Sequence, residues 1–144
     1  LHLCDRRQRQ MCIRDRKEAT VIFEETEPVY VWADEFKIEE VVTNYTSNAL
    51  NHLDGERKVE IKVLQEEDCV KVTVFNTGTP IPEEDIPNLW NKFYKVDKAR
   101  TREYGGSGIG LSIVKAIIES MNQKYGVCNY DNGVEFWFTL DCRQ

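Results

Sequence analysis

The spacing of apolar residues, which changes along the chain between a strand period and a helix period, most constrains the fold. Short strands are predicted at residues 20–24 and 29–33, and a strictly alternating pair at residues 59–63 and 70–74. In two other segments, about residues 34–53 and 109–121, apolar residues recur every three or four positions, as in helices. The strands come as hairpins with helices between them. This order predicts an α+β fold in which helices cover one face of a mixed sheet.

Local signals indicate where these elements begin and end. Asp34 is a suitable N-cap for the first helix. Pro82 and the three acidic residues after it predict the start of a short helix, because negative charge is favourable in a first helical turn. The sequence DNG at residues 131–133 predicts a final hairpin with a type I′ turn.

Composition limits the classes of function. The chain has 144 residues, 41% of them hydrophobic, which suits one domain with a single core. A net charge of −6 argues against nucleic acid or anionic lipid as partners. Any bound phosphate must therefore be held by a local binding motif and not by a basic surface. No apolar run approaches the roughly 20 residues of a membrane span, so we expect no direct membrane contact. Five cysteines without a CxxC pair favour a reducing, cytoplasmic setting.

Residues 1–16 differ from the rest of the chain. They contain five Arg and show no clear hydrophobic period. We interpret residues 1–16 as a non-native or disordered tail, and residues 17–144 as the domain. The alternative is a native, basic helix end.

A stripe of amide side chains lies along the predicted helix of residues 34–53. Asn44, Asn48, Asn51 and His52 fall at positions i, i+4, i+7 and i+8, beside the apolar face. Asparagine and its Thr and Ser neighbours are poor helix formers, which together cost on the order of 3 kcal/mol relative to Ala. Because an asparagine carbonyl is a suitable oxygen ligand for Mg²⁺, this pattern favours a ligand-binding role over a solvated face.

Two loops also have ligand-binding character. Residues 75–82 follow an alternating strand and combine Gly78 with two prolines that stiffen the turn. Residues 105–110, with the sequence GGSGIG, lie between a basic polar loop and an apolar helix. Glycine N–H groups and a helix N-terminus can bind phosphate, although this segment fits neither a P-loop nor a dinucleotide-binding loop. A plain turn and a glycine hinge are the structural alternatives.

In this order and spacing, the segments together resemble the ATP-binding catalytic domain of sensor histidine kinases, in the GHKL superfamily, over about residues 18–140. Residues 39–52 resemble the N box, residues 76–82 the G1 box, residues 89–97 the F box and residues 106–111 the G2 box. The resemblance implies a two-layer α/β sandwich of Bergerat type. ATP would bind between the helices, under a lid of about residues 95–107.

The resemblance also implies roles for single residues. Asn48 would ligate Mg²⁺, Asn44 would support the phosphates and the metal, and Lys95 would supply positive charge, which makes these three the catalytic candidates. Asn76 stands where the family usually has an Asp that accepts a hydrogen bond from the adenine amine, and Asn51 stands where Lys or Arg is common. The candidates for nucleotide contact are Asn48, Asn51, His52, Asn76, Gly78, Ile81, Lys92, Lys95, Gly106, Ser107, Gly108, Ile109, Gly110 and Leu111.

The same resemblance implies phosphotransfer. Superfamily members that hydrolyse ATP carry a Glu general base at the position of Asn44, and an amide cannot take a proton. We therefore expect a protein-histidine kinase domain that presents the γ-phosphate to a histidine on a separate dimerisation domain missing from this chain. A response regulator would be the final acceptor, and the full-length protein would be anchored in a membrane. A non-catalytic nucleotide-binding regulatory module and a simple interaction domain are the alternatives.

Overall fold

The computed structural model describes residues 9–13, 19–23, 28–91 and 109–142. Their elements, in chain order, are strands β1 (Arg9–Ile13) and β2 (Ala19–Phe23), helix α1 (Glu35–Asn51), strands β3 (Lys58–Gln65) and β4 (Cys69–Thr77), a 3-10 turn η1 (Ile86–Asn88), helix α3 (Gly110–Ser120), and strands β5 (Tyr125–Tyr130) and β6 (Gly133–Asp141). Within these ranges, no helix is long and apolar enough to cross a bilayer.

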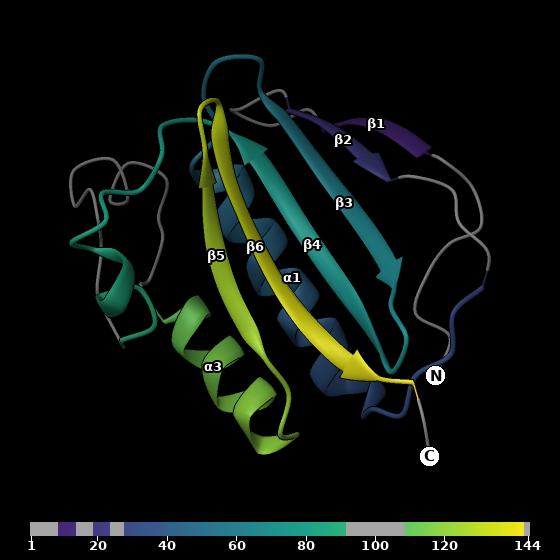
Figure 1. The fold of residues 1–144 in the computed structure, drawn as a ribbon. Helices are drawn as coiled ribbons and strands as arrows, with labels where there is room; N and C mark the ends of the chain where they lie inside the picture. The colour runs from purple at the N-terminus through teal and green to yellow at the C-terminus, as the bar shows by residue number, and fades with distance from the viewer. Residues whose placement is uncertain (1–8, 14–18, 24–27, 92–108, 143–144) are drawn as a thin grey trace.

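The strands form one mixed sheet in the order β1-β2-β3-β4-β6-β5 (Figure 1). β2 runs parallel to β3, and every other neighbouring pair is antiparallel. A parallel pair needs a long crossover, and the connection between β2 and β3 contains α1. The mixed sheet expected from the order of hairpins and helices is therefore confirmed.

Among the described residues, helices α1 and α3 lie side by side and contact each other, so that the sheet and these helices form two layers (Figure 1). Every third or fourth residue of α1 is buried. On β4, Val70, Val72 and Val74 are buried, in the alternation that a core-facing strand shows. The α+β fold with helices on one face of the sheet is confirmed.

Two predicted elements are wrong in kind. Residues 29–33 are an extended segment with a single bridge, at Tyr30, and the Trp32 N–H donates to the Asp141 carbonyl at 3.1 Å. Val29 and Val31 are buried, so the alternation correctly predicted an extended backbone. An extended segment can bury every second side chain without pairing with a neighbouring strand. The helix expected after Pro82 is only the short turn η1.

The final hairpin turns at the predicted place with a different turn. Tyr130 pairs with Gly133, so the loop consists of Asp131 and Asn132. The described non-glycine residues with positive φ lie elsewhere, which excludes the type I′ turn that we predicted. Gly133 instead begins β6, where a Cβ atom would collide with the backbone oxygen of Asn76. This glycine is needed for the close approach of two strands.

Part of the predicted tail pairs with the sheet. Strand β1 lies within residues 1–16 and is antiparallel to β2. The outer edge of β2 offers unpaired backbone groups, which accept a neighbouring strand. Residues 9–13 thus form the edge strand of the described sheet, and the interpretation of residues 1–16 as a non-native or disordered tail stays a prediction.

Candidate nucleotide-binding site

The amide stripe lies on helix α1 beside the face that packs on the sheet. The Asp34 carboxylate caps the helix by accepting hydrogen bonds from the backbone N–H groups of Phe36 at 2.9 Å and Lys37 at 3.2 Å. Buried residues of α1 form the face that packs on the sheet: Ile38, Val41, Tyr45 and Ala49. Beside this face, Asn44, Asn48 and Asn51 are half-buried. The stripe therefore borders the core, as its spacing predicted.

Asn44 faces the first residue of α3. Its side-chain Nδ2 donates to the Glu40 carbonyl at 2.9 Å, one turn back on α1. Its Oδ1 points toward Gly110, where an added Cβ atom would lie only 3.0 Å from this oxygen. The amide stripe of the N box and the last glycine of the G2 box are therefore in close contact.

Helix α3 begins directly at this contact. Ile109 precedes the helix, and its carbonyl accepts from the backbone N–H of Ile113 at 3.0 Å and the Ser112 hydroxyl at 2.7 Å. Leu111 is half-buried and packs against the core. The first N–H groups of a helix have no partners within the helix, and they favour anions. The start of α3 thus directs suitable donors for a phosphate toward the neighbourhood of Asn44.

Asn76 lies at the end of β4 with only 2% of its surface exposed. Its Nδ2 donates to the Thr77 carbonyl at 3.1 Å and to the His52 carbonyl at 3.5 Å. An added Cβ atom on Gly78 would lie 2.7 Å from the same His52 oxygen, so this position needs glycine. The G1 turn is therefore packed against the end of α1, where His52 is the C-cap.

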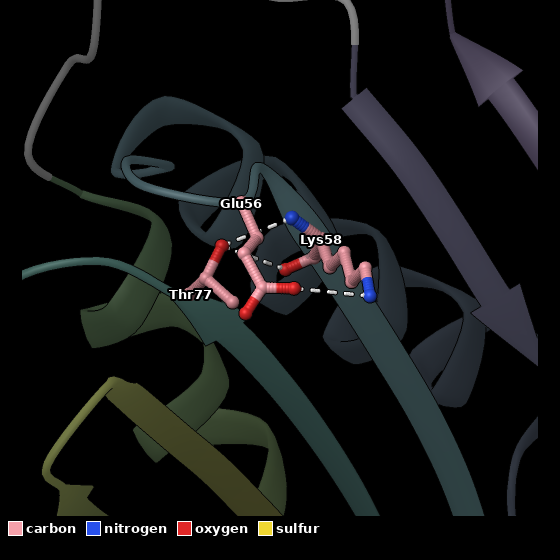
Figure 2. A network of polar contacts seen from close by, with 3 residues as sticks. All are labelled: Glu56, Lys58 and Thr77. Atoms are coloured by element: carbon pink, nitrogen blue, oxygen red, sulfur yellow. Dashed lines mark hydrogen bonds and ion pairs between the residues drawn. The ribbon is translucent and has the colours of Figure 1, made fainter.

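Thr77 fastens the same turn to the beginning of β3. Its hydroxyl accepts a hydrogen bond from the Lys58 N–H at 2.9 Å and donates to the Lys58 carbonyl at 3.5 Å, as Figure 2 shows. The exposed ion pair between Lys58 and Glu56, 3.1 Å long, contributes little. Sequence reasoning treated Thr77 only as part of a motif, since a strand-ending threonine does not reveal its partner.

Trp90 belongs to an aromatic cluster under the site. Its ring lies 4.7 Å from that of Tyr125, 5.9 Å from that of Phe136 and 6.4 Å from that of Tyr45. The Tyr45 hydroxyl donates to the Trp137 carbonyl at 3.0 Å. Burial, with a smaller contribution from Tyr125, raises the pKa of the Tyr45 phenol far above its ordinary value. This phenol therefore stays protonated and joins α1 to the centre of the sheet.

The available ligands fit a metal that is completed by phosphate. Within the described ranges, no group of three or more His, Cys, Asp or Glu side chains could hold an ion. Asn48 and Asn44 offer neutral amide oxygens, and Mg²⁺ takes one or two protein oxygens when phosphates and water supply the others. These amide donors on α1 are therefore compatible with an ATP-bound Mg²⁺.

The structure brings together most of the predicted site. The described candidates converge around α1: Asn44, Asn48, Asn51 and His52 on the helix or its cap, Asn76 and Gly78 at its end, and Ile109, Gly110 and Leu111 at its side. Ile81 lies farther along the loop after β4, beside β5. Lys92, Lys95, Gly106, Ser107 and Gly108 lie outside the described residues. Sequence reasoning missed Asn129, whose contact with Ile81 has no local signal.

A two-layer sandwich with a glycine turn at the end of an amide-lined helix and a second helix starting beside it defines a nucleotide-binding domain of the GHKL class. The chain belongs to the family described as Histidine kinase-, DNA gyrase B-, and HSP90-like ATPase, whose sequence pattern matches residues 33–144.

Known relatives are sensor kinases. The sensor protein kinase WalK of Staphylococcus saprophyticus is 33% identical over 130 residues, which cover 88% of this chain and 21% of WalK. This chain thus spans about a fifth of the length of that curated relative.

Solved structures have the same fold. The catalytic domain of histidine kinase ThkA has a TM-score of 0.67 and 29% identity, covering 89% of this chain and 74% of that one. ThkA has also been solved in complex with the response regulator protein TrrA. Full-length ShkA in complex with AMPPNP has a TM-score of 0.65 and 25% identity, covering 76% of this chain and 22% of ShkA.

Proposed function

We propose that this domain binds ATP with Mg²⁺ between α1 and the start of α3, and supplies the γ-phosphate to a histidine of a separate dimerisation domain in two-component signal transduction. The observation that carries this proposal is the convergence of the G1 turn and the start of α3 on the amide stripe of α1. Family membership and the AMPPNP complex of the similar ShkA support it.

Each described candidate has a role in this proposal. Asn48 ligates Mg²⁺, and Asn44 supports the phosphates beside Gly110. Asn76 accepts a hydrogen bond from the adenine amine through its side-chain oxygen, because its side-chain nitrogen is already directed at backbone carbonyls. Asn51 and His52 border the nucleotide at the end of α1. The remaining contacts are assigned to Gly78, Ile81, Ile109 and Leu111, and to Lys92, Lys95, Gly106, Ser107 and Gly108 outside the described residues.

The residues around Asn44 favour transfer over hydrolysis. Hydrolysis needs a base that can take a proton from water, and the Asn44 amide cannot do so. Glu40 lies one turn back, where its side chain is exposed and its carbonyl accepts from Asn44. The arrangement suits positioning of ATP and stabilisation of charge while an external nucleophile attacks.

The nucleophile belongs to another domain. The chain contains only His2, outside the described residues, and His52, the cap of α1. We assign the acceptor histidine to a dimerisation domain of a longer, membrane-anchored protein whose catalytic part is cytoplasmic. A response regulator is the final acceptor, in line with the ThkA complex.

A second candidate is a non-catalytic nucleotide-binding regulatory module. Asn76 favours it, because a neutral amide replaces the carboxylate that is usual in the family. Charged hydrogen bonds are about twice as strong as neutral ones, so the difference is about 1 kcal/mol, or roughly fivefold in affinity. Adding a separate helical domain with an acceptor histidine and following phosphate from labelled ATP separates the two functions: transfer supports the kinase.

Calorimetry of the chain with AMPPNP, with and without Mg²⁺, tests the proposed binding. We expect Mg²⁺-dependent binding that Asn48→Ala weakens. Asn76→Leu should remove binding, whereas Asn76→Asp should keep it or make it tighter. Equal affinity of the Leu and Asp variants would reject the adenine role of Asn76.

A further inference from the structure

The side chain of Asn129 makes a two-bonded contact with the backbone of Ile81. The Ile81 N–H donates to Asn129 Oδ1 at 2.9 Å, and Asn129 Nδ2 donates to the Ile81 carbonyl at 2.8 Å. One planar amide thus satisfies both backbone groups of one residue, 48 positions away in the sequence. A neighbouring strand residue makes the same pair of bonds in a sheet.

Within residues 80–82, only Ile81 has the backbone N–H that such a pair needs. Ile81 lies between Pro80 and Pro82, and proline has no backbone N–H. Asn129 is close to the end of β5, the edge strand of the sheet, where it pairs with Val134 of β6. Its amide therefore pairs with the backbone of Ile81 as a residue of a neighbouring strand would.

A second contact holds the same loop to the same hairpin. The Gly78 N–H donates to the carbonyl of Asn132 at 3.0 Å, in the turn between β5 and β6. Figure 1 shows the segment after β4 passing the end of this hairpin. Ile81 is half-buried and packs against the core, so the two bonds to Asn129 also determine where its side chain lies.

We propose that Asn129 is a positioning residue of the nucleotide site: it fixes Ile81, the residue of the G1 loop that the proposed function assigns to nucleotide contact. This inference rests on the proposed nucleotide binding. Asn129 is itself exposed and directed at Ile81, so it acts on the ligand through Ile81.

The experiment compares AMPPNP binding by the wild-type chain and by Asn129→Ala and Asn129→Asp, using calorimetry. One net hydrogen bond corresponds to about fivefold in an equilibrium constant, so the Ala variant, in which the nucleotide must order the released loop, should bind up to about fivefold more weakly for each bond lost. Asp has the size of Asn and keeps the acceptor, but its ionised carboxylate cannot donate to the Ile81 carbonyl. The Asp variant should also be weaker, a loss that a merely space-filling role would not produce. Asn122→Asp is the control, because it adds the same charge at an exposed position after α3.

Amide hydrogen exchange at Ile81 gives an independent measurement. We expect faster exchange at Ile81 in the Ala variant, with unchanged exchange in β3 and β4, which would show that the variant is folded. Wild-type affinity in both Asn129 variants, or unchanged exchange at Ile81, would overturn the positioning role. If the wild-type chain binds no AMPPNP, the proposed function fails and this inference fails with it. If the wild-type chain binds AMPPNP and both Asn129 variants bind it equally well, only this inference fails.

Discussion

Replacing Tyr45 by Phe tests whether its buried hydroxyl joins α1 to the sheet. Tyr45 has no exposed surface, and its hydroxyl donates to the Trp137 carbonyl at 3.0 Å. The substitution keeps the ring, which packs 5.4 Å from Phe136 and 6.0 Å from Phe138, and removes only the hydrogen bond. Any change in stability therefore reports that bond.

At pH 8, the expected loss is about 1 kcal/mol, within a range of about 0.5–1.5 kcal/mol for one net hydrogen bond. With a urea dependence of about 2 kcal/mol per molar for a domain of this size, the unfolding midpoint should fall by ~0.5 M. Nucleotide affinity should change little, because the ring still supports the helix that carries the amide stripe.

The difference should depend on pH with a defined sign. Burial raises the pKa of the Tyr45 hydroxyl in the folded state above its ordinary value of 10.0. Above about pH 10, the unfolded chain loses this proton while the folded chain keeps it, so wild-type stability falls as pH rises. Phe has no proton to lose. The wild type is therefore expected to lose its stability advantage over the Phe variant at about pH 10.7 and to be the less stable protein above it. For a hydrogen bond of about 0.5–1.5 kcal/mol, this crossing lies between about pH 10.1 and 11.1.

Urea unfolding of both proteins at pH 8, 9, 10 and 11, followed by circular dichroism, measures this difference. Other tyrosines and the lysines titrate equally in both proteins, so only the difference between the two curves matters. A constant gap from pH 8 to pH 11 would refute the reasoning, because it would mean that Tyr45 ionises as readily in the folded chain as in the unfolded one.

Two other pairs of substitutions test local packing and capping. Gly133→Ala should destabilise the domain by more than about 2 kcal/mol and weaken AMPPNP binding, because the new Cβ collides with the Asn76 backbone. Gly55→Ala is the comparison. Gly55 has a φ of 67° and open space around it, so this substitution should cost only about 1 kcal/mol. Thermal unfolding and calorimetry distinguish them, and similar losses in both would contradict the close-approach argument. Asp34→Ala should lower stability by about 1 kcal/mol through loss of the cap of α1, while Asp34→Asn should restore most of it in urea unfolding; an Asn variant as unstable as the Ala variant would argue against capping.

The sequence alone determined the two long helices, two of the hairpins and the order of the motifs. The period of apolar residues is a local property, so α1, α3 and the hairpins of β3 with β4 and β5 with β6 could all be predicted. The Asp34 cap is equally local, since donor and acceptor are neighbours in the chain. The resemblance to the histidine kinase boxes likewise needed only their order and spacing.

Where local patterns had more than one structural solution, the predictions differed from the structure. The alternation at residues 29–33 indicates which side chains are buried but does not show whether the segment pairs with another strand. An extended segment was therefore mistaken for a strand. The DNG signal located the last turn but not its type, because Gly133 serves the approach of β6 to Asn76.

Only the tertiary structure decided which distant groups meet. The contact of Asn44 with Gly110, the amide of Asn129 on Ile81, and the hydroxyl of Tyr45 on Trp137 each join residues that are far apart in the chain. These contacts depend on the order of strands in the sheet and on how α1 packs over it. Sequence periods describe one element at a time, and therefore could identify the pieces of the nucleotide site without showing what holds them in place.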